Sequence, residues 1–379
     1  SQSGDANADS DGEARLWSSI LNQDWSVEIW GEIARRYNSE IWVGGYDLLN
    51  EPVHYNGRQV RELQKRMSER IREFDKNHIL FVNGNYWSRA FEDLVPKFDD
   101  NMVWAFHYYS WMVNAPVSKN TIQYLIDLRK NTNTPLWLGE TGENSNEWFV
   151  QLRTLIEQNN IGWAWWNYKK IGTINAPVSS PTDPVYQEIL NYWGGSGSKP
   201  NFDRSLLGLN NMVENLKFEN CDLRKDVVAS LLSKDFQAKG IPYKSYSIPG
   251  KVEFVDYDLG SLGVAYYDRD FIDDRSDGGS YKAWNKGYRY RNDGVDIEIG
   301  GDGFYVSHTE SGEFLKYTLN VIKSDRYDVL VTTSSSSIEA ELSLQVQNNR
   351  VLDRISVPAT GQYGIWKEHN IGQIDLEKG

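Results

Sequence analysis

The sequence predicts two structural regions: an α/β region with a parallel sheet, and an all-β sandwich after it. Between residues 11 and 195, short apolar runs alternate with long amphipathic segments, as in parallel βα units. Glycine, serine and proline cluster at 194–200, which marks a boundary. From Lys251 onward the apolar runs are short and alternating, as in β-sandwiches. We therefore predict a barrel-like domain at 1–195, a helical appendage and linker at 196–250, and a β-sandwich module at 251–379.

Five buried strands are expected in the α/β region, ending near residues 50, 84, 109, 140 and 168. The apolar run Ile41-Trp42-Val43 leads into the first, and the whole stretch is expected to be a buried strand that ends at Asn50-Glu51, where Pro52 stops the element. Apolar residues at helical spacing predict the helices around these strands, at 11–38, 60–76, 88–95, 119–131, 146–159 and 183–193. A further helical pattern covers 205–236.

Five strands are fewer than a complete barrel needs. A (β/α)₈ barrel has eight strands and about 250 residues. If the α/β region is such a barrel, its first three strands lie upstream of Ser1. We therefore expect a partial (β/α)₈ TIM barrel that is truncated at its N-terminal side.

The last region is predicted to contain the strands 252–257, 314–321, 327–332 and 340–346. One more strand-like piece precedes the final residue, Gly379. We expect a jelly-roll-like β-sandwich with a further strand beyond that point.

Composition restricts the possible partners. The net charge is −13 and the isoelectric point is near 5.0, which argues against nucleic acid or an anionic membrane surface. The 15 tryptophans and 22 tyrosines can form core, but they also suit stacking on sugar faces. Cys221 is the single cysteine, so no intramolecular disulfide can form. No apolar run is long enough to span a bilayer, so we expect no membrane insertion.

Two glutamates are the candidate catalytic residues. Glu51 and Glu140 each follow an apolar strand pattern, so both should face one cleft at the carboxyl ends of parallel strands. Glycoside hydrolysis uses such a pair, one acid to protonate the leaving oxygen and one carboxylate as nucleophile or base. The alternative is that each glutamate caps the next helix. The shared setting, with Asn50 directly before Glu51, favours catalysis.

The α/β region resembles glycoside hydrolase family 5, on motifs that occur in the family's order. They are Asn50-Glu51-Pro52, His107-Tyr108-Tyr109, Leu138-Gly139-Glu140 and Gly162-Trp163-Ala164-Trp165-Trp166. The resemblance implies that Glu51 is the acid/base and Glu140 the nucleophile, with Tyr109 beside it. It also implies that Asn50 bonds the sugar 2-hydroxyl, that Trp166 stacks on a sugar, and that His107 contacts substrate. For His107, a structural role is equally open.

Residues 251–379 resemble carbohydrate-binding module family 6, on Val252 to Asp258, Asn292 to Glu298, Ser311 to Tyr317 and Pro358 to Gly361. The resemblance implies a sugar clamp at His308 and Tyr363, where members carry larger rings. It also implies a structural calcium that Glu253 would help to bind, although Val255 occupies the second ligand position. The aromatic-rich insert 281–290 is a further candidate sugar platform, or an edge cover.

Together these features predict a secreted, extracellular or cell-surface retaining hydrolase of a β-linked polysaccharide. The first expectation is an endo-β-1,4-glucanase; mannan, xylan and β-1,3-glucan stay open as substrates. The rival hypothesis is a carbohydrate-binding fragment without catalysis. Hydrolysis by two glutamates needs no cofactor, and we expect a monomer whose partner is the polysaccharide.

Overall fold

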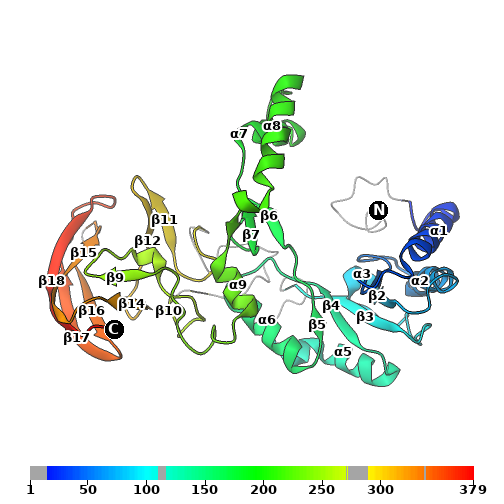
Figure 1. Cartoon of the computed structure of the whole chain (residues 1–379), viewed down its shortest axis with the longest axis horizontal. Coiled ribbons are helices and arrows are strands. Elements are labelled where there is room, and N and C mark those ends of the chain that lie inside the picture. The colour runs from blue at the N-terminus through cyan, green and yellow to red at the C-terminus, as the bar shows by residue number, and fades with distance from the viewer. Residues whose placement is uncertain (1–14, 110–116, 270, 272–288, 337–338) are drawn as a thin grey trace. The chain divides into compact units, whose positions relative to one another are not determined.

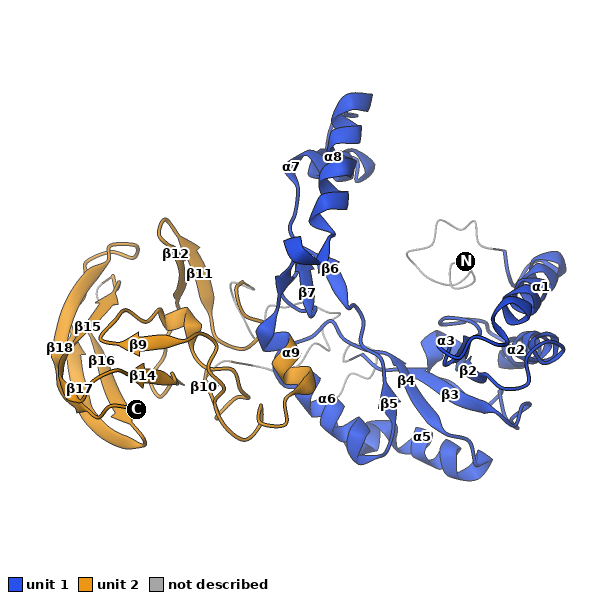
Figure 2. Ribbon diagram, in the orientation of Figure 1, with its two compact units in different colours: residues 1–227, 273–283 blue, residues 228–272, 284–379 orange. Residues whose placement is uncertain are grey.

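The computed structural model describes residues 15–109, 117–269, 271, 289–336 and 339–379. Figure 2 shows the two compact units into which the chain divides, residues 1–227 with 273–283 and residues 228–272 with 284–379. The segment 196–250, which the sequence set apart, is shared between the two units. The domain limits 1–195, 196–250 and 251–379 stay a prediction.

The first unit is built on a five-stranded parallel sheet (Figure 1). Its strands are β1 (Gly45–Asp47), β2 (Ile79–Asn83), β3 (Met102–His107), β4 (Leu136–Glu140) and β5 (Gly162–Trp163), in that spatial order. Each strand pairs in parallel with the next. The arrangement is five strands of a (β/α)₈ barrel, which confirms the predicted partial barrel.

Helices precede or join these strands, and three of them begin at a side-chain cap. The helices are α1 (Ile20–Tyr37), α2 (Gly57–Arg72), α3 (Asn85–Ser88), α5 (Lys119–Thr132) and α6 (Asn146–Gln158). The side chains of Ser19, Asn56 and Ser145 accept backbone N–H bonds at the starts of α1, α2 and α6. Each such cap stabilises its helix by about 1 kcal/mol. The capping residues therefore set where the chain leaves a loop and enters a helix.

The sheet has two differently buried faces. Leu80, Val82, Trp104 and Phe106 are fully buried on β2 and β3. Helix α2 buries residues such as Met67 at helical spacing. Burying each large apolar side chain contributes roughly 1.5–3 kcal/mol. Phe81 and Val103, which lie on the other face of these strands, are only half-buried. On that face the rings of Phe81 and Trp137 meet edge to face, 5.6 Å apart.

Three local predictions in this unit are wrong. Ile41 and Trp42 are 84% and 88% exposed and precede β1 instead of belonging to a buried strand. The helix expected at 88–95 is replaced by the short turn α3, inside which Tyr86 and Trp87 have left-handed dihedrals. The strand expected at 162–168 ends at Trp163. In each case an apolar or aromatic run has more than one compatible local structure, and packing selects among them.

The rest of the first unit is a small sheet and a helical hairpin. The sheet contains β6 (Lys169–Ile171), β7 (Val178–Ser180) and β8 (Asp222–Leu223). Helices α7 (Pro184–Trp193) and α8 (Phe202–Asn215) pack side by side (Figure 1), followed by the 3₁₀ turn η2 (Phe218–Asn220). Helix α9 (Lys225–Leu232) lies across the division between the units.

The second unit is rich in β-structure. It contains β9 (Tyr246–Ile248), β10 (Tyr266–Tyr267), β11 (Ile297–Gly300), β12 (Gly303–Val306), β13 (Phe314–Leu315), β14 (Leu319–Val321), β15 (Asp325–Thr333), β16 (Ala340–Val346), β17 (Asn349–Val357) and β18 (Lys367–Leu376). Antiparallel pairs β15–β18 and β16–β17 are the longest. The core holds Val255, Tyr257, Ala265, Tyr266, Val295 and Ile297.

Some of the strands predicted in this unit are confirmed and others are wrong. The strand expected at 340–346 is confirmed, and the one at 327–332 lies within β15. The strand expected at 252–257 is wrong, because Phe254–Asp256 forms a 3₁₀ turn, η3. There the buried Asp256 carboxylate accepts bonds from Lys244 and the tyrosine hydroxyls of Tyr246 and Tyr290, which no alternating strand pattern anticipates. The strand expected at 314–321 is split into β13 and β14.

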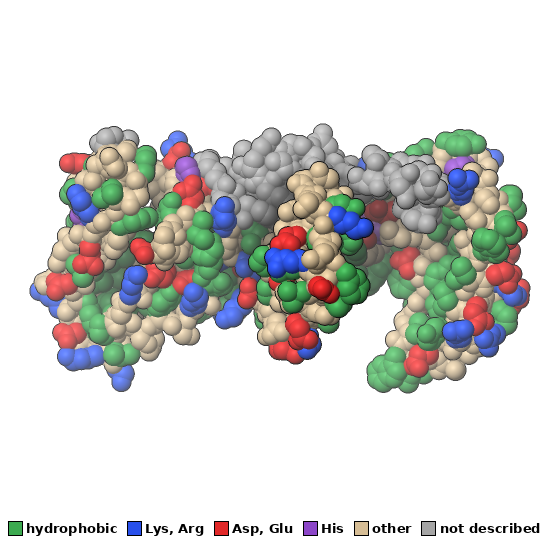
Figure 3. Space-filling model, turned by 90° about the horizontal axis from the view of Figure 1, so that it is seen from above, with side chains coloured by type: hydrophobic (Ala, Val, Ile, Leu, Met, Phe, Trp, Pro, Cys, Tyr) green, Lys and Arg blue, Asp and Glu red, His purple; other side chains and the backbone are tan. Residues whose placement is uncertain are grey.

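The described surface mixes charge with apolar side chains. On the face seen in Figure 3, acidic and basic side chains are interspersed among hydrophobic ones in both units. Within the described residues, no helix has both the length and the apolarity needed to cross a membrane.

Candidate active site

Three strands of the sheet deliver titratable side chains to one place. Glu51 follows β1, His107 ends β3 and Glu140 ends β4. A register shift between Phe106 and His107 pairs His107 directly with Glu140 across the β3–β4 ladder. The backbone N–H of Tyr108 then donates to the Glu140 carbonyl at 3.1 Å. The strand ends thus bring together residues that lie up to 89 positions apart in the sequence (140 − 51).

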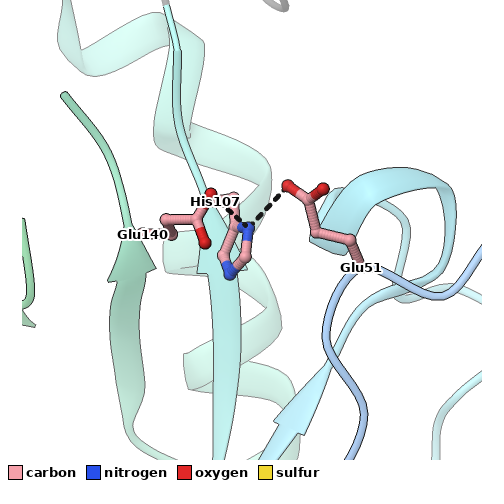
Figure 4. Close-up of side chains that lie close together, drawn as sticks. All are labelled: Glu51, His107 and Glu140. Atoms are coloured by element: carbon pink, nitrogen blue, oxygen red, sulfur yellow. Dashed lines mark hydrogen bonds and ion pairs between the residues drawn. The ribbon is translucent and has the colours of Figure 1, made fainter. Parts of the chain in front are cut away.

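The His107 imidazole lies between the two glutamates, as Figure 4 shows. Its Nδ1 is 2.7 Å from Glu51 Oε1 and 3.8 Å from Glu140 Oε1. One carboxylate oxygen of each glutamate and a ring nitrogen of His107 all lie within 4.8 Å of one another. His107 is buried, while the two glutamate side chains are 17% and 21% exposed. The site is therefore a partly open carboxylate pair with an imidazole at its base.

Tyr109 completes the surroundings of Glu140. Its hydroxyl donates to Glu140 Oε1 at 2.8 Å. Burial first, and then the Glu140 charge, raise the pKa of Tyr109, so this hydroxyl keeps its proton and remains a donor.

The surroundings of Glu140 shift its pKa in both directions. Burial raises the pKa of the Glu140 carboxyl, and the neighbouring Glu51 charge adds to the rise. His107 and the Tyr109 hydrogen bond lower the pKa and oppose that shift. The net direction is upward, so the ionised form of Glu140 depends on its contacts with His107 and Tyr109.

Asp47 is a third carboxylate of this region. It lies on β1, an edge strand of the sheet, and the residue is exposed. Desolvation by the surrounding protein nevertheless raises the pKa of its carboxyl to about 6. The His107 field lowers the pKa, and so does a 2.6 Å hydrogen bond from Asn83 Nδ2. The electrostatic coupling to His107 and Glu140 links Asp47 to the carboxylate pair.

Asn50 and Trp166 also lie near these residues. Asn50 is exposed and directly precedes Glu51. Trp166 is 48% exposed, and its backbone N–H donates to the carbonyl of Thr141, the residue after Glu140, at 2.7 Å. Trp165 is instead half-buried and packs edge to face against Phe149 and Trp163. Trp166 therefore has an accessible ring beside the strand end that carries Glu140.

The first region is similar to proteins of a known family. Residues 4–172 match the model of the cellulase family, glycosyl hydrolase family 5. The matched range contains Glu51, His107 and Glu140. The motifs that suggested this family from the sequence are therefore confirmed for the first region, whereas the β-sandwich module family stays a prediction.

Individual relatives are modestly similar. Endoglucanase C of Acetivibrio thermocellus is 25% identical over 223 residues, covering 44% of this chain and 64% of the relative. A β-xylosidase of Phanerodontia chrysosporium is 30% identical over 214 residues, covering 47% of this chain and 44% of the relative. The chain thus spans less than two thirds of either relative. The solved structure of endoglucanase Cel5A from Thermotoga maritima is 20% identical, with a TM-score of 0.37, and covers 41% of this chain and 62% of that one.

The Glu51, His107 and Glu140 cluster also offers ligand atoms for a metal ion. Two carboxylates and one imidazole are donors that zinc and similar ions accept. In the structure, however, the His107 Nδ1 that would face such an ion is hydrogen-bonded to Glu51. An ion bound through this nitrogen would therefore have to replace the His107–Glu51 hydrogen bond.

The sugar clamp predicted in the second unit stays a prediction, and the structure describes the surroundings of its two residues. His308 Nε2 lies 3.3 Å from Glu298 Oε1, and Tyr363 is 78% exposed. Trp366, close to Tyr363 in sequence, packs edge to face on Tyr305. Glu253 pairs with Lys251. Residues 281–288 of the aromatic insert lie outside the described residues, while Tyr290 packs on Phe304.

Sequence reasoning missed two asparagines of the β2 end. Asn83 donates to Asp47, and the side chain of Asn85 bonds the backbone of His54. The available signal was the run Asn83-Gly84-Asn85 directly after an apolar strand, the same setting that singled out Glu51 and Glu140.

Proposed function

We propose that the protein is a retaining glycoside hydrolase of a β-linked polysaccharide, acting as an endo-β-1,4-glucanase. The observation that carries this proposal is the approach of the Glu51 and Glu140 carboxylate oxygens to within 4.8 Å. Retaining glycosidases hold their two carboxyl groups about 5–5.5 Å apart, whereas inverting enzymes need about 6.5–9.5 Å to admit a water. The cellulase family match and the endoglucanase relatives support the same class.

In the first step, Glu140 attacks the anomeric carbon and the glycosidic C–O bond breaks. Glu51 transfers its proton to the leaving oxygen, so no free alkoxide forms. In the second step, Glu51 removes a proton from water, the water oxygen bonds the anomeric carbon, and the Glu140 ester bond breaks. Both glutamates return to their starting states, and no redox cofactor or metal enters the balance.

Other residues would orient the sugar and the two carboxyl groups. The hydrogen bond between His107 Nδ1 and Glu51 fixes that carboxyl above the strand ends, and Tyr109 holds Glu140. We assign Asn50 to the sugar 2-hydroxyl, a contact that strengthens in the transition state. We assign the accessible ring of Trp166 to stacking on a sugar face beside the cleavage point.

Several polysaccharides are candidate substrates. β-1,4-Glucan comes first because the relatives include endoglucanases, while the β-xylosidase relative keeps xylan open. Mannan and β-1,3-glucan remain further candidates. Product analysis of the full-length protein against this panel tests the proposal. Cello-oligosaccharides of mixed length from β-1,4-glucan support it, whereas absence of hydrolysis on every polysaccharide favours a binding protein instead.

We also propose that the second unit binds glucan through its exposed aromatic side chains. Tyr363 is 78% exposed, and Trp366, close to it in sequence, forms a ring pair with Tyr305. In a Glu140→Gln background, Tyr363→Ala should weaken retention on insoluble glucan, whereas Leu330→Ala, an exposed change on β15, should not. Equal retention would remove Tyr363 from the site. A structural calcium near Glu253 and an extracellular location remain proposals on family resemblance.

A further inference from the structure

We propose that Asn85 is a positioning residue for the acid Glu51. The inference rests on the proposed function, since it assigns Asn85 a role in proton donation by Glu51. Asn85 would not touch the sugar. It would act through the backbone of the segment that carries the acid.

The segment that holds Glu51 needs external support. Directly after β1, the Leu48 N–H donates to the Phe81 carbonyl at 3.1 Å. Beyond it, Glu51 has φ +45°, a left-handed conformation that is unfavourable for a residue with a Cβ. Such a conformation persists only where surrounding contacts hold it.

Asn85 supplies such a contact with both ends of its side-chain amide. The His54 backbone N–H donates to Asn85 Oδ1 at 3.0 Å, and Asn85 Nδ2 donates to the His54 carbonyl at 2.8 Å. His54 is three residues after Glu51. Asn85 itself is 3% exposed, so solvent does not compete for these bonds. The Asn85 amide thus hydrogen-bonds both backbone groups of His54, as the backbone of a neighbouring strand would.

Asn85 is in turn held by the turn that follows β2. Its N–H donates to the Ala90 carbonyl at 2.8 Å, and its carbonyl accepts from Ala90 N–H at 2.9 Å. Tyr86, Trp87 and Ser88 all have positive φ between these two points. The Ser88 hydroxyl closes the turn by donating to Asn83 Oδ1 at 2.5 Å. The contacts over-determine this left-handed turn, and Asn85 occupies its fixed base.

The two supports of Glu51 are therefore complementary. His107 orients the carboxyl group from β3, and Asn85 fixes the backbone from the β2 turn. A misplacement of about 1 Å in a catalytic group can lower the rate about 100-fold. Loss of the Asn85 contacts should therefore impair the step in which Glu51 protonates the leaving group, and leave attack by Glu140 largely intact.

The test compares two substrates in the full-length protein. Cellopentaose has a poor leaving group that needs protonation, whereas 2,4-dinitrophenyl β-cellobioside has a good one that hardly needs it. Asn85→Asp keeps the shape and one acceptor but places an oxygen against the His54 carbonyl. We expect kcat/KM to fall at least tenfold on cellopentaose and less than threefold on the dinitrophenyl substrate. Equal losses on the two substrates would overturn the inference.

Controls separate folding and the proposed function from this result. The ratio of the two rates in one sample does not depend on the folded fraction, and Asn85→Ser serves if Asn85→Asp fails to fold. Asn101→Asp is a matched change, because Asn101 Nδ2 also donates to a backbone carbonyl. Asn101 directly precedes β3 and so lies at the amino end of that strand, opposite the end that carries His107. Asn101→Asp should leave the ratio unchanged. Glu51→Gln must show a still larger ratio; equal losses there would overturn the role of Glu51 itself.

Discussion

Glu51 and His107, 56 positions apart in the sequence, are joined by a 2.7 Å hydrogen bond between Oε1 and Nδ1. The bond ties the end of β1 to the end of β3, and His107 is register-paired with Glu140 on β4. A single imidazole thus connects both carboxylates of the proposed pair.

Substitution of either glutamate should lower activity, and azide should then distinguish their roles. Glu51→Gln and Glu140→Gln should each lower kcat/KM by at least about 100-fold, the usual scale for loss of such a group. Azide added to Glu140→Ala should restore turnover and give the α-glycosyl azide, because azide replaces the nucleophile. Azide added to Glu51→Ala should give the β-product after normal attack by Glu140. The opposite assignment of products would exchange the two roles.

Tyr109→Phe should move the acidic limb of the pH profile. The Tyr109 hydrogen bond lowers the pKa of Glu140 against the rise caused by burial. Its removal raises that pKa further, so the active ionised form is lost at a higher pH as the solution is acidified. We expect the acidic limb of the kcat/KM profile to move up by about one pH unit, which matches the loss of one hydrogen bond to a charged group. Tyr108→Phe is the control, since the Tyr108 hydroxyl bonds Thr121; an equal shift there would contradict the account.

Asp47 should make stability fall as pH rises. Its pKa is raised from 3.8 to about 6 in the folded protein, so the folded state binds more protons than the unfolded state between these values. The free energy of unfolding therefore decreases with pH across this window. Asp47→Asn removes the effect, and its Tm relative to wild type should increase from pH 4 to pH 7. Asp100→Asn, a change at an exposed side chain, should give a constant difference.

Chelation should leave hydrolysis intact. Glu51, His107 and Glu140 offer metal-ligand atoms, but the proposed mechanism uses them as acid, positioning group and nucleophile. Protein treated with EDTA should keep more than about four fifths of its activity on an aryl β-cellobioside, a rate difference that corresponds to only a fraction of 1 kcal/mol. The small substrate avoids any contribution from the second unit. Activity lost to EDTA and restored by a divalent ion would show that the cluster works as a metal site.

The sequence was most informative at the strand ends. Glu51, His107 and Glu140 could be found because an apolar run that stops at a polar residue predicts the rim of a parallel sheet, where such residues meet. The partial barrel followed from the same alternation. The limits predicted for α2 and α6 came close because the caps Asn56 and Ser145 act locally.

The missed features depend on tertiary contacts. The left-handed turn at Tyr86–Ser88 has no propensity signal, since none of its three residues is glycine. Ile41 and Trp42 look like a buried strand, but apolar character alone does not say whether a neighbour covers it. The link from Asn85 to His54 joins two loops and could be seen only once both were placed.

The stereochemistry of the first product tests the central claim most directly. A soluble β-glucan oligosaccharide is hydrolysed in an NMR tube by the full-length protein, and the anomeric proton is observed before mutarotation. Carboxylate oxygens within 4.8 Å fit the short separation of retaining enzymes, in which a carboxylate, here Glu140, attacks the anomeric carbon directly. The account predicts that the β-anomer appears first. Initial formation of the α-anomer would contradict it.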